Sequence, residues 1–124
     1  MKIAYIAGPY TANNDMEIEV NVSIACQVAW QLWQMGFSVI CPHANSGFFA
    51  HIPNHKHLNT SEVDFIQGDL EIISRFHGGK DCLVMLPRWE ESKGARAERE
   101  FARNRGLNVF YWPEDKEKLV RFVV

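Results

Sequence analysis

The sequence predicts an α/β protein, a three-layer sandwich with a small parallel sheet of four to five strands, Rossmann- or flavodoxin-like. Short runs rich in β-branched and aromatic residues alternate with longer stretches whose apolar residues recur at helical spacing. Glycine and proline stand at most of the boundaries. Each parallel return needs a crossover, so this alternation is typical of a sheet covered on both faces. With 124 residues, we expect residues 1–124 to form a single domain.

Four strands and four helices are expected in order along the chain. The strands are expected at residues 2–7, 37–41, 82–86 and 107–112, and the helices at residues 16–35, 61–76, 92–105 and 113–123. Gly36 and Gly106 follow two of the helices as stop signals. Ser92 is a suitable N-cap, and Pro113 stands at a tolerated first helical position.

Composition excludes several classes of protein. The chain is 47% apolar and 23% charged, which is ordinary for a globular domain and argues against disorder and coiled coils. No apolar run is long enough to span a membrane, and the first residues are too short an apolar run for a signal peptide. Net charge is −5 over residues 1–74 and +3 over residues 75–124. The basic part is interleaved with acids, so it favours a phosphate-bearing ligand over a nucleic-acid partner.

Three cysteines lie far apart, at Cys26, Cys41 and Cys82. An odd count without paired spacing argues against a disulfide framework and against a zinc site. We interpret them as reduced, buried thiols and expect a cytoplasmic protein.

The carboxyl ends of the strands are where ligands bind in open parallel sheets. That edge is expected to carry residues from four turns, among them Gly8, Pro9, Tyr10, His43, Asn45 and Trp89. Trp89 is a candidate for stacking on a base, and equally for covering the edge of the core.

Two acids occupy the apolar arcs of predicted helices. Glu98 falls among Ala95, Phe101 and Ala102, and Asp69 falls inside the apolar arc of the helix before it. A carboxylate that faces the interior is costly unless it is paired or protonated. Each acid alone is open to a structural interpretation, in which it forms a stabilising bond to a backbone amide or to an arginine. Two on successive helices at one edge favour acid–base or nucleophilic catalysis.

An ordered set of motifs resembles a known superfamily. The set is Tyr5-Ile6-Ala7-Gly8-Pro9-Tyr10, then Gly68-Asp69-Leu70 ahead of Asp81, then Ser92-Lys93-Gly94-Ala95-Arg96-Ala97-Glu98. It is similar to the nucleoside 2-deoxyribosyltransferase superfamily, which includes deoxynucleoside 5′-monophosphate N-glycosidases and short phage and bacterial relatives. The resemblance extends from Lys2 to about Trp112.

The resemblance implies a role for each matching residue. Glu98 matches the nucleophile that attacks C1′ of the sugar, and Tyr5 matches the tyrosine that orients it. Asp69 matches the aspartate beside the sugar and the leaving base. Gly8 lies in the turn that lines the pocket. Ser92 and Gly94 match the segment that holds a 5′-phosphate, at a helix start that suits an anion.

Departures from the family pattern bear on the reaction. The transferases commonly carry an aspartate where Ser92 stands, so the serine favours the hydrolytic branch that binds phosphate. Arg96 occupies a position that is often small, and the longer tail that completes a neighbouring transferase site has no match here. These departures favour cleavage of the N-glycosidic bond over base exchange. The expected mechanism is a double displacement like that of retaining glycoside hydrolases.

The segment 42–60 is long for a connection and favours a functional lid. His51, His55 and His57 are weak candidates for metal ligands because no cysteine or carboxylate completes a set. We expect no metal and no cofactor. His43 and Asn45 are candidates for contact with the base, and Arg88, Lys93 and Arg96 are open to both phosphate binding and plain surface charge.

The alternative to catalysis is a nucleotide-binding module that uses the same pocket without chemistry. A homodimer or higher homo-oligomer is what the resemblance implies, and Trp30 and Trp33 permit it. The expected partner is a small nucleoside or nucleotide, with no nucleic acid and no membrane.

Overall fold

A computed structural model of the chain describes residues 1–47, 49 and 62–124. Four parallel strands form one sheet in the order β2-β1-β3-β4. They are β1 (Ile3–Ala7), β2 (Ser38–Ile40), β3 (Cys82–Met85) and β4 (Asn108–Tyr111). The predicted α/β class and parallel sheet are confirmed, and β1 lies inside the sheet with Tyr5 opposite Ile40 and Leu83.

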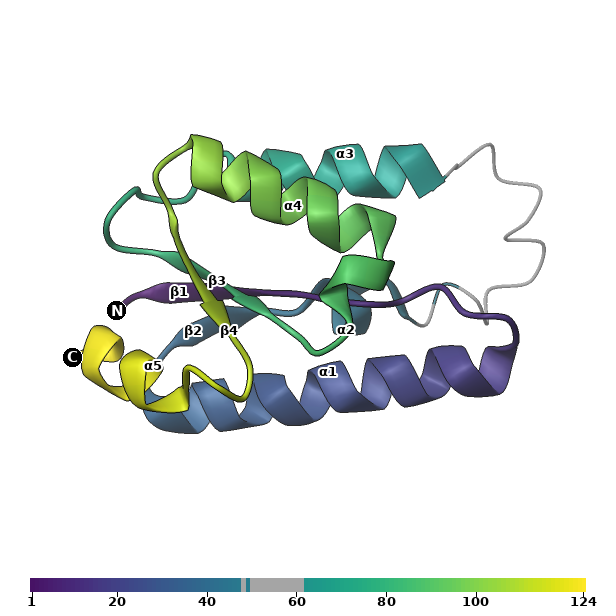
Figure 1. The fold of residues 1–124 in the computed structure, drawn as a ribbon, viewed down its shortest axis with the longest axis horizontal. Coiled ribbons are helices and arrows are strands. Elements are labelled where there is room, and N and C mark those ends of the chain that lie inside the picture. The colour runs from purple at the N-terminus through teal and green to yellow at the C-terminus, as the bar shows by residue number, and fades with distance from the viewer. Residues whose placement is uncertain (48, 50–61) are drawn as a thin grey trace.

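Helices cover both faces of this sheet (Figure 1). On one face lie α1 (Asp15–Met35) and α5 (Lys116–Val123), and on the other lie α3 (Glu62–Ile73) and α4 (Lys93–Asn104). Two short helices follow strands directly, α2 (Pro42–Ser46) after β2 and the 3₁₀ helix η3 (Trp89–Glu91) after β3. The three layers agree with the expected sandwich.

Local chemistry accounts for the helix ends. The Asn14 side chain accepts a hydrogen bond from Glu17 N, so α1 begins one residue before the predicted start. Gly36 ends α1 with φ 110°, a left-handed conformation that suits glycine. The Ser92 side chain accepts from Ala95 N at 3.1 Å, which confirms the predicted N-cap of α4.

Two predicted helix boundaries are wrong. The helix predicted to end at residue 76 ends at Ile73, the last residue of α3. The last helix begins at Lys116 rather than at Pro113, because Asp115 first closes a turn by accepting a hydrogen bond from Tyr111 N. The segment 42–60, interpreted from the sequence as a functional lid, opens with the short helix α2, which has Pro42 in its first turn. Most of the remaining predicted lid, with Phe48, His51, His55 and His57, lies outside the described residues.

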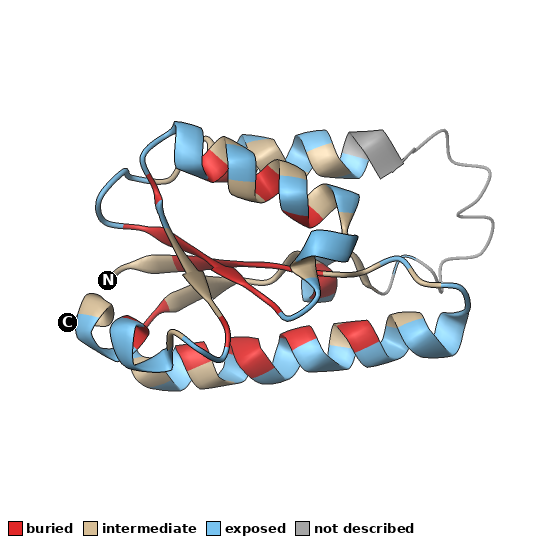
Figure 2. Ribbon diagram, in the orientation of Figure 1, coloured by how far each residue is buried: buried red, intermediate tan, exposed pale blue. Residues whose placement is uncertain are grey.

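Alternate residues of β1 separate two cores. Ala4 and Ile6 pack with residues of α1 and α5, whereas Tyr5 and Ala7 pack with residues of α3 and α4. Figure 2 shows the central strands as the most continuously buried part of the molecule. The expectation of three buried thiols is correct only for Cys82. Cys41 is half-buried, and Cys26 is exposed on α1 because it lies off the arc that faces the sheet.

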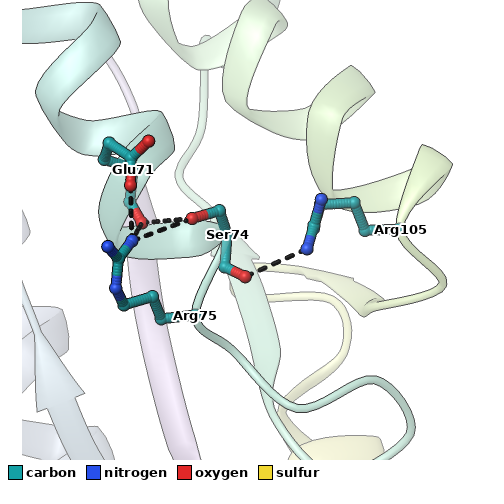
Figure 3. A network of polar contacts seen from close by, with 4 residues as sticks. All are labelled: Glu71, Ser74, Arg75 and Arg105. Carbon is teal, nitrogen blue, oxygen red and sulfur yellow. Dashed lines mark hydrogen bonds and ion pairs between the residues drawn. The ribbon is translucent and has the colours of Figure 1, made fainter.

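The C-terminal ends of α3 and α4 are tied together by polar contacts (Figure 3). Arg105 Nη2 donates to the carbonyl of Ser74 at 3.0 Å, and Arg75 pairs with Glu71 one turn earlier. The outer Arg75–Glu71 pair is exposed and contributes little by itself. The link from Arg105 to Ser74 holds the ends of the two helices that carry the acids Asp69 and Glu98.

Among the described residues, no helix combines the length and apolar character needed to cross a bilayer.

Candidate functional site

Tyr5 and Glu98 meet in the layer between the sheet and α4. The Tyr5 hydroxyl donates a hydrogen bond to Glu98 Oε2, joining residues that are 93 positions apart in the chain. Tyr5 is fully buried and Glu98 is only 7% exposed. The buried position of Glu98 agrees with its place in the apolar arc of the predicted helix.

Asp69 approaches the same pair from α3. The charge of Asp69 raises the pKa of both Tyr5 and Glu98, so the three groups act on one another. Asp69 itself is half-buried. The structure thus brings together the three residues to which the sequence assigned catalytic roles.

Burial is the main cause of the unusual titration of these groups. Desolvation raises the pKa of Glu98 to about 8, aided by the charge of Asp69 and opposed by the Tyr5 hydrogen bond. Desolvation likewise raises the pKa of Asp69 to about 6, and interaction with the Tyr5 hydroxyl opposes the rise. The pKa of Tyr5 lies far above its ordinary value, first through burial and then through both acids. Tyr5 therefore remains a proton donor at neutral pH.

Perturbed acids that influence each other electrostatically are typical of acid–base and nucleophilic catalysis. One carboxyl group of higher pKa sits beside one of lower pKa, and a tyrosine hydroxyl orients the more buried of the two.

A groove of about 740 Å³ lies at the carboxyl ends of β1 and β3. This is the point where the strand order reverses, which is the usual ligand position in such sheets. Its lining includes Pro9, Tyr10, Asn21, Arg88, Ser92 and Lys93, along with Thr11, Ala12, Asn13, Glu17, Val20 and Glu91. Tyr5, Asp69 and Glu98 do not line it. Ser92 lies six positions before Glu98, about 9 Å along the axis of α4.

The turn after β1 has a steric requirement for glycine. A Cβ on Gly8 would lie 2.6 Å from the Cβ of Leu86, closer than side chains allow. Leu86 N donates to the carbonyl of Ala7 at 2.8 Å, which explains the close approach of the two strand ends. Gly8 therefore permits this packing.

His43 lies at the same edge and forms a hydrogen bond with Pro9, the residue that follows Gly8 in the turn. Its Nε2 lies 2.9 Å from the carbonyl of Pro9, so Nε2 carries the proton and Nδ1 is free to accept. Burial lowers the pKa of His43, with the Pro9 and Gly8 carbonyls opposing the shift. No described residue donates to Nδ1, although the atom is buried. The His43 ring also meets the Tyr10 ring edge-on, with centroids 6.0 Å apart.

The other predicted residues are more dispersed. Asn45 is exposed on α2. Trp89 is half-buried; Arg99 lies over its ring at 4.7 Å, and Tyr111 packs beside it. Gly94 lies in the first turn of α4, where an added Cβ would meet Ile66 of α3 at 3.7 Å. Arg96 donates to the carbonyl of Glu90 and does not line the groove.

Asn21 belongs to this edge although no sequence pattern singled it out. The residue is only 7% exposed, and its side chain links the turn after β1 to Arg88. The signal that could have found it is the same as for Glu98, because Asn21 lies on the apolar arc of its helix with Ala25, Val28 and Leu32.

Among the described residues there is no cluster of three or more histidine, cysteine or acidic side chains that would hold a metal ion. The weak candidates for metal ligands (His51, His55 and His57) lie outside that part of the chain.

Comparison with known proteins places the chain in a family. No curated protein matches it. A family model described as a domain of unknown function, DUF4406, matches residues 1–111, a range that holds all four strands and the residues Tyr5, Asp69 and Glu98. The chain belongs to the DUF4406 family.

Proposed function

We propose that this protein cleaves the N-glycosidic bond of a small nucleoside or nucleoside 5′-monophosphate, with Glu98 as the nucleophile. The observation that carries the proposal is the buried hydrogen bond from Tyr5 to Glu98 with Asp69 acting on both groups. The resemblance to nucleoside 2-deoxyribosyltransferases in the motifs around these residues supports it.

In the first step, the Glu98 carboxylate attacks C1′ and forms a glycosyl ester. The bond from C1′ to the base breaks, its electron pair goes to the base nitrogen, and protonated Asp69 supplies a proton to that nitrogen. Because the pKa of Glu98 (about 8) lies above that of Asp69 (about 6), this reactive form, with the proton on Asp69, is the minor form of the singly protonated pair. The positive charge that develops on the sugar favours the ionised form of Glu98 in the transition state.

In the second step, water attacks C1′, releases Glu98 as a carboxylate and returns a proton to Asp69. A second base in place of water would give base exchange. The Tyr5 hydrogen bond holds the Glu98 oxygen in place throughout and favours its ionised form. The alternative role for Asp69 is to hold the sugar as a carboxylate, and the pH dependence of the rate separates the two roles.

Release of free base tests the proposal. Nucleosides and their 5′-monophosphates are incubated with the wild type, with Glu98→Ala and with Glu100→Ala, and the products are separated by chromatography. Glu100 is a matched control because it lies on the same helix and is exposed. We expect base from the wild type and from Glu100→Ala only. Equal release by Glu98→Ala would refute Glu98 as the nucleophile.

A nucleotide-binding module without chemistry is the second candidate. The groove supports it, because Arg88 and Lys93 supply positive charge there independently of Glu98. Tight binding of a nucleotide with no base released over long incubation would favour this function.

We also propose a homodimer or higher homo-oligomer that acts in the cytoplasm. Trp30 and Trp33 support self-association because 64% and 49% of their surfaces are exposed on α1. Three free cysteines are in keeping with a reducing compartment. Sedimentation equilibrium tests the first point, and a monomer at all concentrations would overturn it.

A further inference from the structure

Arg88 has a backbone conformation that arginine seldom adopts. It follows β3 by three residues and has φ 65° and ψ 20°, and no other non-glycine residue in the described ranges has a positive φ. This conformation starts η3 and turns the chain at the edge of the groove. The Arg88 side chain lines that groove together with Ser92 and Lys93.

A buried amide holds the Arg88 side chain. Asn21 Oδ1 accepts from Arg88 Nη2 at 3.1 Å, and Asn21 Nδ2 donates to the carbonyl of Tyr10 at 3.2 Å. Asn21 is 7% exposed, so it is a fixed point between α1, the turn after β1 and the end of β3. A buried amide with both ends hydrogen-bonded has one orientation, which it imposes on the guanidinium.

Most of the Arg88 donors have no partner among the described residues. Within that part of the chain the nearest acid is Glu91, whose carboxylate lies 3.7 Å from Nη1, and both side chains are more than 60% exposed. Such a pair is weak and easily exchanged. Arginine presents a planar fork that matches a phosphate with two parallel hydrogen bonds. Arg96 differs, because its guanidinium is bonded to the carbonyl of Glu90.

We propose that Arg88 determines specificity for the 5′-phosphate of the substrate and that Asn21 is the positioning residue that aims it. The inference rests on the proposed function, since it assigns one end of the same substrate. Arg88 contacts the phosphate, and Asn21 acts only through Arg88 and through the turn at Tyr10.

Binding measurements test both assignments. Each common 2′-deoxynucleoside 5′-monophosphate and its nucleoside are titrated by calorimetry into Glu98→Gln, which prevents turnover. Arg88→Gly, Arg88→Lys, Asn21→Ala and the double variant Asn21→Ala/Arg88→Gly are compared on this background. Glycine readily adopts the positive φ found at position 88. The Arg88→Gly variant therefore lacks the guanidinium without adding backbone strain. Arg96→Ala is the matched control because Arg96 is exposed and outside the groove.

We expect Arg88→Gly to weaken 5′-monophosphate binding roughly 10- to 100-fold and to leave nucleoside binding within about twofold. The 5′-monophosphate affinity of Arg88→Lys should lie between those of Glu98→Gln and Arg88→Gly. Lysine keeps the positive charge but lacks the planar pair of donors that arginine presents to a phosphate. Asn21→Ala weakens 5′-monophosphate binding about three- to tenfold, and the double variant is no weaker than Arg88→Gly. Arg96→Ala leaves the preference for phosphate unchanged.

Several results would overturn the inference. Equal loss of nucleoside and nucleotide binding in Arg88→Gly would remove its specificity role. Additive losses in the double variant would show that Asn21 does not act through Arg88. Absence of 5′-monophosphate binding to Glu98→Gln, the background of all the variants, would also overturn the inference. Should Asn21→Ala fail to fold, the exposed Arg88 variants still decide the specificity role.

Failure of the proposed cleavage and failure of the Arg88 inference would give different results. If the wild type releases no base but binds 5′-monophosphates in an Arg88-dependent way, the inference stands and N-glycosidic cleavage does not. If the wild type releases base with the same preference for phosphate as Arg88→Gly, the cleavage stands and the inference does not.

Discussion

The two layers that cover the sheet differ in what they bury. The layer of α1 and α5 packs the sheet with apolar side chains such as Leu32, Phe37 and Leu119. The layer of α3 and α4 buries an apolar cluster too, but Glu98 and the Tyr5 hydroxyl lie inside it. Neighbouring residues of one strand, Ala4 and Tyr5, belong to different layers. Apolar packing stabilises both faces of the sheet, but only the face under α3 and α4 also buries an acid, Glu98, which reduces stability.

After the complete loss expected in Glu98→Ala, the greatest loss of activity is expected in Asp69→Asn, within the layer of α3 and α4. If Asp69 supplies the proton, base release falls roughly 10²- to 10⁴-fold. The wild-type kcat/KM should then have a bell-shaped dependence on pH, with limbs near pH 6 and pH 8. The reason is that the Asp69–Glu98 pair must hold one proton to react. In Asp69→Asn only Glu98 titrates, so the rate rises with pH to a plateau.

A pH series of initial rates for both proteins measures this. A wild-type rate that simply rises through pH 8 would show that Asp69 holds the sugar as a carboxylate. A bell that persists in Asp69→Asn would contradict both roles.

The apolar layer is expected to respond in stability alone. Leu32 is fully buried against the sheet, so Leu32→Ala should lower the free energy of unfolding by about 2–5 kcal/mol. The rate per folded molecule should not change. Urea denaturation measures the loss, with Val120→Ala as the control because Val120 is exposed. A changed rate in Leu32→Ala would show that the two layers are not separate in function.

The layer of α3 and α4 should gain stability when its buried acid is neutralised. The pKa of Glu98 rises from about 4.5 to about 8 in the folded state. Between these values the folded protein holds a proton that the unfolded chain lacks, so stability falls as pH rises from about 4.5 to 8. Glu98→Gln lacks this dependence and should be more stable than the wild type above pH 8, by on the order of 2–4 kcal/mol.

Thermal unfolding at pH 5 and at pH 8.5 checks this prediction. The advantage of Glu98→Gln should be small at the lower pH and full at the higher one. An advantage of equal size at both would show that Glu98 is not the group that titrates.

The mildest change is expected from Tyr5→Phe. This variant removes the hydrogen bond that lowers the pKa of Glu98, so Glu98 should ionise at higher pH. We expect base release near pH 7 to fall about tenfold, as for loss of one hydrogen bond to a charged group. The pH profile should shift upward in the same variant. A lower rate with an unshifted profile would mean that the Tyr5 hydroxyl orients Glu98 without lowering its pKa.

Several features can be predicted from the sequence because they depend on local periodicity. Alternation of strands and helices predicts the parallel sheet, and Ser92 predicts the start of α4. Helical spacing alone predicts that Glu98 lies on an inward face, which its burial confirms. These properties follow from neighbours within one or two turns, which the sequence states directly.

Other features depend on tertiary contacts. The pairing of Tyr5 with Glu98 joins residues 93 positions apart, and the link from Asn21 to Arg88 spans 67. Cys26 looks apolar in sequence, yet it is exposed because of how α1 is rotated against the sheet. The short α2 and the late start of α5 follow from turn contacts at Pro42 and Asp115.

Periodicity and turn residues were enough to predict the class of fold, the inward direction of Glu98 and the edge of the sheet at which the groove lies. Three features needed the folded chain: the hydrogen bond from Tyr5 to Glu98, the groove beside Arg88, and the hydrogen bond from Arg88 to Asn21. The division arises because periodicity sets which face a side chain occupies. Which distant side chain it meets there depends on strand order, helix rotation and burial, and these are properties of the whole packed chain.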